Sequence, residues 1–388
     1  MFMKELRVAL FTGNYNHIRD GVSLTLNRLV KFLESQGIPV LVFAPTVDKP
    51  ALEHNGRMVS VPSIRMPVSG RGEYRVASGF SVKAEKELKD FNPTLIHIAT
   101  PDAAGYKALK WAKKNRVQVV SSYHTHFTSY FKYYGLTPIE FLAWRYLSWF
   151  YNSTTHVYVP SQSMIDELVT HGFEKGMKIW ARGVNTKLFS PQKRDMEWRR
   201  KAGFKDDDIV VTFVSRLVWE KELDTYRHSV QQVASKNPKV KALVVGDGPA
   251  KSELQEHMPE AHYTGFLEGE DLARAYASSD VFLFPSHTET FGNVTLEAMS
   301  SGLPCLVADA TGSKSLVDHD ENGGLAEPEN KADFAKKLSI IVSDKELRDK
   351  MKKVSREKAL LYDWDEINGQ LLDNYKEALE LPIPEEDI

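Results

Sequence analysis

Short apolar runs alternate with amphipathic segments along most of the chain, and this alternation limits the possible folds more than any other feature. The first series of such runs occupies residues 7–13, 39–45, 95–99, 117–123 and 156–160. Strands that alternate with helices form a parallel sheet with helices on both faces. We therefore expect a doubly wound α/β fold, in which ligands bind beyond the carboxyl ends of the strands.

A second series of apolar runs follows the polar, charged stretch 191–205, which we interpret as the linker and the entry to a second domain. This series occupies residues 209–215, 241–245, 281–285 and 304–308. A chain of 388 residues is too long for one ordinary core. We predict an N-terminal domain over 1–190, a second domain over 191–362, and a C-terminal helix and tail over 363–388 that return to the first domain.

Composition restricts the cellular context. Cys305 is the single cysteine, so an intramolecular disulfide is excluded and a reducing compartment is favoured. No apolar run reaches the roughly 18 residues of a spanning helix, and the N-terminus lacks the apolar core of a signal peptide. We expect a cytoplasmic protein, either soluble or peripheral on the inner face of the cytoplasmic membrane.

Charge is divided unevenly between the two halves. Lys and Arg outnumber Asp and Glu by ten in residues 1–191, whereas acids outnumber bases by twelve in the remainder. The basic half could bind an anionic surface, although two domains can also differ in net charge without a functional reason. We expect no nucleic-acid partner.

The stretch HTETFGNVTLEAMSSG, residues 287–302, carries the most specific chemistry. It follows an apolar run and passes through a glycine-containing turn into a helix that should begin near Asn293. Loop amides and the positive end of the helix dipole form a seat for a phosphate or a sugar hydroxyl. Glu289 lies in the loop, and Glu297 shares a helix face with Asn293. Carboxylates accept hydrogen bonds from vicinal hydroxyls, although either acid alone is more often simply solvated.

Glu289 and Glu297, with Phe291-Gly292-Asn293 between them, resemble the E-x7-E signature of the retaining family-four glycosyltransferases. Arg216 and Lys221 come directly after the strand at 209–215 and resemble the R-x4-K element of that family. Two cations at a strand-to-helix connection suit a diphosphate. Glu222 departs from the pattern, because the family often has glycine after the lysine. The resemblance implies a GT-B fold: two Rossmann-like domains that face each other across a cleft containing the active site.

Two N-terminal segments extend this resemblance. SYHTHF, residues 122–127, resembles the family's strand-end histidine: His124 would lie near the sugar's primary hydroxyl, and His126 could face the acceptor. A metal is not expected there, because the two histidines alternate in extended chain and no further ligands complete a site. In the loop 14–21 only Gly21 matches the family's glycines. The absence of G-x-G-x-x-G after the first strand argues against a dinucleotide-dependent dehydrogenase.

The resemblance implies three groups of site residues. The catalytic group is His124, Arg216, Lys221 and Glu289. The donor-binding group is Gly21, Arg216, Lys221, Gly246, Gly248, Phe266, Glu289, Phe291, Gly292, Asn293, Val294 and Glu297. The acceptor-binding group is Asn14, His126 and Arg145.

The implied reaction moves a hexosyl unit from a nucleoside-diphosphate sugar to an acceptor hydroxyl with retention of configuration. Residues 97–105 and 122–127 are most similar to GDP-mannose-dependent mannosyltransferases and sulfoquinovosyl-diacylglycerol synthases, so we expect GDP-mannose as donor. The basic half of the chain and its aromatic region favour a lipid or lipid-linked glycan as acceptor. The sugar nucleotide is a co-substrate, and no cofactor or metal is expected. The alternatives are a UDP-sugar donor, a nucleotide-sugar epimerase, or a non-catalytic sugar-nucleotide-binding protein.

The aromatic region 127–151 and the basic segment before it could contact a membrane. Lys107, Lys110 and Lys114 share a helix face, and cations near an anionic membrane contribute about 1 kcal/mol each. A solvated face is an equally good interpretation of these lysines. Core packing is expected for Leu142, Leu147 and Phe150.

Overall fold

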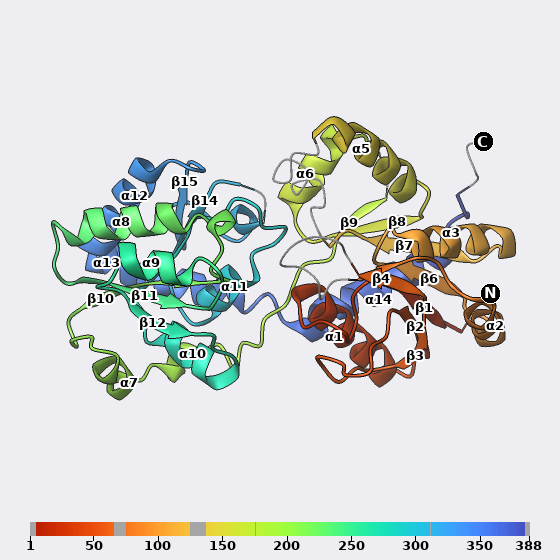
Figure 1. The fold of residues 1–388 in the computed structure, drawn as a ribbon, viewed down its shortest axis with the longest axis horizontal. Coiled ribbons are helices and arrows are strands. Elements are labelled where there is room, and N and C mark those ends of the chain that lie inside the picture. Colours follow the sequence, from red (N-terminus) through yellow and green to blue (C-terminus); the bar gives the residue numbers. More distant parts are fainter. Residues whose placement is uncertain (1–4, 66–74, 125–136, 175, 311, 385–388) are drawn as a thin grey trace. The chain divides into compact units, whose positions relative to one another are not determined.

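The protein folds as two compact units with separate parallel sheets (Figure 1). The computed structural model describes residues 5–65, 75–124, 137–174, 176–310 and 312–384. Unit 1 comprises Met1–Ala181 and Asp365–Ile388, and unit 2 comprises Arg182–Trp364.

Unit 1 contains a seven-stranded sheet in the order β3-β2-β1-β6-β7-β8-β9, with every described pairing parallel. The strands are β1 (Val8–Phe11), β2 (Val40–Ala44), β3 (Arg57–Ser60), β6 (Leu95–Ile98), β7 (Gln118–Ser122), β8 (His156–Val159) and β9 (Met177–Ile179). A small antiparallel pair consists of β4 (Ser63–Arg65) and β5 (Arg75–Ala77). The chain order reverses between β1 and β6, which creates a topological switch point.

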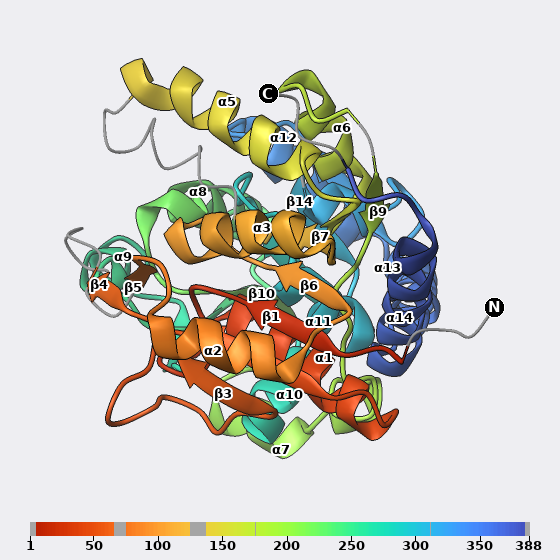
Figure 2. The same cartoon turned by 90° about the vertical axis from the view of Figure 1, so that its right-hand side faces the viewer.

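Helices cover both faces of the unit-1 sheet. They are α1 (Gly21–Ser35), α2 (Val82–Phe91), α3 (Ala103–Asn115), α5 (Thr137–Asn152), α6 (Gln162–Thr170) and the C-terminal α14 (Trp364–Glu380). Figure 2 shows α2 and α3 crossing one face. Residues alternate between faces along β6. Ile98 meets α3 at Gly105, whereas His97 bonds Tyr375 of α14, so α14 packs on the opposite face.

Unit 2 contains a six-stranded parallel sheet in the order β12-β11-β10-β13-β14-β15. Its strands are β10 (Ile209–Val214), β11 (Val240–Val245), β12 (His262–Gly265), β13 (Val281–Phe284), β14 (Cys305–Ala308) and β15 (Gly323–Ala326). Its α-helices are α7 (Met196–Lys201), α8 (Leu223–Ala234), α9 (Lys251–His257), α10 (Gly269–Ala277), α11 (Asn293–Ser300), α12 (Lys331–Ser343) and α13 (Lys345–Ala359). Short 3-10 turns are η1 (Pro191–Lys193), η2 (Trp219–Lys221) and η3 (Ser313–Ser315).

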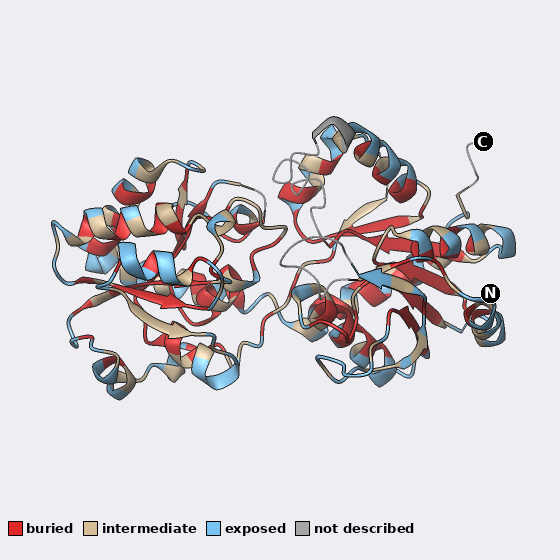
Figure 3. Ribbon diagram, viewed as in Figure 1, coloured by how far each residue is buried: buried red, intermediate tan, exposed pale blue. Residues whose placement is uncertain are grey.

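The central strands of both sheets are buried on both faces (Figure 3), as parallel strands between helix layers must be. The two sheets confirm the expected doubly wound α/β architecture.

The stretch 191–205, expected to be the linker and the entry to the second domain, is a folded part of unit 2. It forms η1 and α7, and the Arg199 side chain is completely buried. Arg199 donates to the Asp280 carboxylate at 3.0 Å and to the Ser278 and Asp208 carbonyls at 2.6 and 2.8 Å. These hydrogen bonds from the two terminal nitrogens of a buried guanidinium anchor the segment to the unit-2 sheet.

The expected core packing of α5 is wrong at one position. Leu147 and Phe150 of α5 are buried as expected, but Leu142 is 61% exposed. The loop after β1 packs into unit 1, because Tyr15, Asn16, His17 and Ile18 are buried. No described helix is long and apolar enough to cross a membrane.

Candidate functional site

The carboxyl ends of β10 and β13 lie side by side in unit 2, because these strands are neighbours at the point where the strand order reverses. The segment after β10 leads through Arg216 into η2 and α8. The segment after β13 carries Glu289 and enters α11 at Asn293, where the sequence predicted a helix start. The two most specific motifs of the sequence therefore meet at one sheet edge.

Lys221 and Glu289 form a direct ion pair, with Nζ 2.5 Å from Oε1. About a fifth of each side chain is exposed, so the pair is partly shielded but open to a ligand. The Ser286 hydroxyl also donates to Glu289, at 3.2 Å. Arg216 is exposed and forms no ion pair with any residue that the structure describes. The candidate site thus contains one cation balanced by a carboxylate and a second cation facing solvent.

Glu222 adopts the left-handed conformation that glycine favours, with φ 59° and ψ 41°. The turn after Lys221 is therefore the one that a glycine would make, at a cost of about 1 kcal/mol for a residue with a side chain. Its carboxylate accepts a hydrogen bond from Thr225 at 2.9 Å, which offsets part of that cost. The departure from the family pattern does not change the local backbone path.

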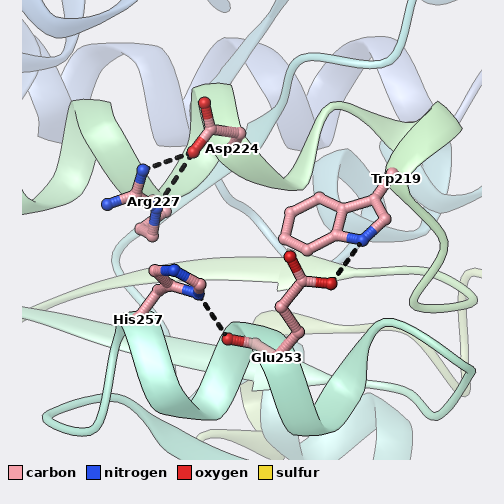
Figure 4. A pocket seen from close by; sticks show the side chains of 5 residues that line it. All are labelled: Trp219, Asp224, Arg227, Glu253 and His257. Atoms are coloured by element: carbon pink, nitrogen blue, oxygen red, sulfur yellow. Dashed lines mark hydrogen bonds and ion pairs between the residues drawn. The ribbon is translucent and has the colours of Figure 1, made fainter.

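A pocket of about 360 Å³ lies beside η2, between α8 and α9 (Figure 4). It is lined by Trp219, Asp224, Arg227, Glu253 and His257. Trp219 donates to the Glu253 carboxylate at 3.1 Å, and Arg227 Nε donates to Asp224 at 3.0 Å. The Trp219–Glu253 bond ties η2, and hence Lys221, to α9.

The N-terminus of α11 has the features of an anion-binding site. No described side chain caps this helix, and Gly292 precedes it at φ 94°. Its first-turn amides and the helix dipole therefore point to a site where negative charge is stabilised. Gly312 packs under this loop: a Cβ at that position would lie 2.3 Å from the Glu289 carbonyl oxygen. The sequence reasoning missed Gly312, although it follows the predicted strand 304–308.

Gly246 and Gly248 have a packing role in addition to the predicted donor contact. A Cβ on Gly246 would lie 1.9 Å from the Ser215 carbonyl oxygen, and one on Gly248 would lie 2.3 Å from that of Leu217. Gly246 also has φ 136°, which side chains rarely adopt. Glycine here lets the segments after β10 and β11 approach closely, which fixes the position of Arg216.

The other predicted donor residues lie on the same unit. Glu297 accepts a hydrogen bond from the Tyr276 hydroxyl at 3.3 Å, and Phe291 is buried against Tyr362. Asn293 is exposed and Val294 is partly buried at the start of α11. Phe266 follows β12 and is 70% exposed. Its ring is therefore accessible for stacking against a base.

A second strand-end cluster lies at the switch point of unit 1. Asn14 follows β1 and donates to Asp20 at 3.1 Å; Asp20 in turn caps α1, whose first residue is Gly21. Asp102 follows β6 and caps α3 through the Ala104 and Gly105 amides at 3.0 Å each. Burial raises the pKa of Asp102 to about 6. The sequence reasoning did not single out Asp102, although the strand-end rule would have indicated it.

The remaining predicted unit-1 residues are separated. His124 follows β7, is buried, and contacts the Ser122 hydroxyl through Nε2 at 2.7 Å. Arg145 is exposed on α5. His126 lies outside the described residues.

One group of described side chains in unit 2 could hold a cation. The ligand atoms of Glu222, His287 and Glu329 lie within 4.8 Å of one another, and His287 Nε2 is 3.7 Å from Glu329 Oε1. Glu329 is largely exposed, so the group also fits an ordinary surface ion pair.

Family models match both units. Residues 19–188 match the model described as "Glycosyltransferase Family 4", and residues 195–358 match "Glycosyl transferases group 1". The two matches together span most of the described chain.

Curated proteins of similar sequence are named as transferases. The sulfoquinovosyl transferase SQD2 of Arabidopsis thaliana is 31% identical over 93% of this chain and 71% of its own length. A GDP-mannose-dependent alpha-mannosyltransferase of Corynebacterium glutamicum is 30% identical over 98% of this chain and 91% of its own.

Solved structures share the fold at lower identity. Sucrose-phosphate synthase of Thermosynechococcus elongatus superposes with a TM-score of 0.78 at 19% identity, covering 97% of this chain and 99% of that one. HepE of Anabaena in complex with UDP superposes with a TM-score of 0.75 at 20% identity, covering 96% and 100%. The chain therefore belongs to the family-four and group-1 glycosyltransferases, and it is a glycosyltransferase with the GT-B fold.

Proposed function

We propose that the enzyme transfers mannose from GDP-mannose to a hydroxyl of a lipid or lipid-linked glycan, with retention of configuration. The observation that carries this proposal is the Lys221–Glu289 pair beside the uncapped N-terminus of α11. Relatives named as GDP-mannose-dependent mannosyltransferases support the donor, and those named as alpha-monoglucosyldiacylglycerol synthases support a lipid acceptor.

The donor diphosphate would replace Glu289 as the partner of Lys221. Lys221 is paired with this carboxylate. A diphosphate carries more charge and would draw Lys221 and Arg216 to itself, with the α11 amides as further donors. Glu289 would then accept hydrogen bonds from the sugar hydroxyls. The ion pair thus holds Lys221 near the site of the diphosphate and Glu289 near the site of the sugar hydroxyls.

The rest of the donor lies along unit 2 in this proposal. Glu297 accepts from the ribose hydroxyls, and Phe266 stacks on the base. Gly246 and Gly248 let the backbone approach the nucleotide. In unit 1, Gly21 approaches the phosphates and His124 contacts the sugar, while Asn14, His126 and Arg145 contact the acceptor.

The proposed reaction is the one that membership of the retaining glycosyltransferases implies. The acceptor oxygen bonds to C1 of the sugar on the face that the diphosphate leaves, and the C1–O bond to the diphosphate breaks. The acceptor proton passes to the departing phosphate oxygen, so the products are the glycoside and the nucleoside diphosphate. Arg216, Lys221 and the α11 amides stabilise the charge that develops on the leaving group. Because two cations serve the diphosphate, we propose no metal and no cofactor.

We also propose that α3 and α5 contact an anionic membrane. Phe141 and Leu142 of α5 are 69% and 61% exposed, and Trp149 is 44% exposed. The lysine stripe of α3 lies nearby, because Tyr106 of α3 contacts Trp149. Exposed aromatic and apolar side chains beside lysines suit a headgroup region. Co-flotation with vesicles containing phosphatidylglycerol, compared with pure phosphatidylcholine vesicles, tests this surface.

A thermal-shift panel of GDP-, UDP- and ADP-sugars tests the donor. A ligand that binds only the native state raises its stability with the logarithm of saturation. GDP-mannose should raise the melting temperature most. A larger shift with a UDP-sugar would assign the enzyme to that donor instead, and isomerisation of the donor without acceptor would indicate an epimerase.

A further inference from the structure

A buried chain of hydrogen bonds links the C-terminal helix to His124. The Tyr375 hydroxyl of α14 lies 2.6 Å from His97 Nδ1, and His97 Nε2 lies 2.8 Å from the Ser122 hydroxyl. The same Ser122 oxygen lies 2.7 Å from His124 Nε2. We call Tyr375, His97 and Ser122 the relay. All four residues belong to unit 1.

The relay is sealed from water. Tyr375, His97 and Ser122 have no exposed surface. Aromatic rings of Tyr158 and Trp180 pack edge-on against His97. Burial lowers the pKa of His97 to about 3, so this ring is neutral near pH 7. A neutral imidazole has one donor and one acceptor nitrogen, and the relay must therefore have a direction.

Counting protons determines that direction. Among the described residues the Tyr375 hydroxyl contacts only His97, so its proton has an acceptor only if it is donated to His97 Nδ1. His97 then carries its proton on Nε2 and donates it to Ser122. The Ser122 hydroxyl in turn donates to His124 Nε2. The opposite direction would leave the Tyr375 proton buried without an acceptor, and an unsatisfied buried donor destabilises the fold.

We propose that Tyr375, His97 and Ser122 are positioning residues that hold His124 in the neutral form protonated on Nδ1. His124 Nε2 is then always an acceptor within the protein, and Nδ1 is the nitrogen that donates. Only the consequence for catalysis rests on the role proposed for His124; the tautomer itself does not.

The relay gives the returning helix a role in the site. Tyr375 lies 278 residues after His97 in the sequence, on a helix that is also held by the Lys178–Glu377 ion pair at 2.6 Å. Docking of α14 therefore delivers the hydroxyl that sets the state of a strand-end histidine.

Nitrogen-15 NMR of the full-length enzyme labelled at its 12 histidines tests the tautomer directly. Protonated and unprotonated ring nitrogens resonate far apart, and His97 and His124 are assigned from single His→Gln variants. We expect His124 protonated on Nδ1 and His97 on Nε2. A His124 signal protonated on Nε2, or an even mixture of tautomers, overturns the proposal.

Matched variants test the effect on turnover. Ser122→Ala breaks the relay, whereas Ser122→Thr keeps a hydroxyl. We expect Ser122→Ala to lower kcat about three- to tenfold, the factor that corresponds to one buried hydrogen bond, with little change in donor KM. Ser122→Thr should recover most of kcat. An equal loss of kcat in both variants would show that Ser122 acts only by packing, and would overturn the positioning role.

Tyr158 offers a control in the same aromatic cluster. Its buried hydroxyl has no hydrogen-bond partner among the described residues. Tyr375→Phe should broaden or shift the His124 ring signals, whereas Tyr158→Phe should leave them unchanged; identical spectra for both variants contradict the relay. If wild-type enzyme transfers no sugar from any donor, the proposed function fails, but the tautomer measured without ligand still decides the relay.

Discussion

Replacing Glu289 by Gln should tighten the binding of free GDP while it slows transfer. The Glu289 carboxylate lies 2.5 Å from Lys221 Nζ, so GDP must compete with this carboxylate for the lysine. A hydrogen bond to a charged group contributes about 1.5–3 kcal/mol when shielded. A fifth of each side chain is exposed, so we take about 1.4 kcal/mol, which corresponds to a tenfold lower Kd for GDP in Glu289→Gln.

Isothermal titration of GDP measures this effect in wild type, Glu289→Gln and a control. Glu329→Gln is a suitable control, because Glu329 is an exposed acid near the same loop that does not contact Lys221. We expect unchanged affinity in the control, and a reduced kcat in Glu289→Gln because the sugar loses an acceptor. The argument is refuted if Glu289→Gln weakens GDP binding, because the acid would then support the diphosphate site rather than compete with the ligand.

Three further predictions concern stability and metal dependence. Burial alone would raise the pKa of Asp280, but Arg194 and Arg199 hold it below its usual range, and Asp280→Asn should cost about 3–5 kcal/mol in urea unfolding because Arg199 stays buried without its counter-charge. The pKa of His97 is lower in the folded state than in the unfolded state, so the stability that neutral His97 contributes is present above about pH 6.5 and is lost as pH falls towards 3. Within this range the free energy of unfolding should fall by up to about 1.4 kcal/mol per pH unit. His97→Gln should flatten this dependence of the unfolding free energy on pH. Exhaustive treatment with EDTA should leave kcat unchanged, whereas activity restored only by an added divalent ion would implicate the Glu222–His287–Glu329 group.

Local patterns predicted much of the fold and which residues meet at the candidate site in unit 2. The apolar runs identified the central strands, and a glycine turn before an amphipathic segment placed the start of α11 at Asn293. Arg216, Lys221 and Glu289 could be expected together because the carboxyl ends of neighbouring parallel strands share one sheet edge.

What the sequence did not indicate depends on contacts between distant segments. Nothing local marks Tyr375 as the partner of His97. The polarity of 191–205 suggested a linker because burial of Arg199 depends on Asp280, which lies far along the chain. Leu142 was assigned to the core on composition, yet the direction that it faces on α5 leaves it exposed.

The most direct test of the proposed function is transfer of labelled mannose from GDP-mannose to a lipid extract by wild-type and Lys221→Ala enzyme. Removing one preorganised charge from the leaving-group site should lower kcat/KM by roughly 10²–10³-fold. Lys236→Ala, which removes an exposed lysine after α8, should retain wild-type activity. Near-normal kcat/KM in Lys221→Ala would contradict the account.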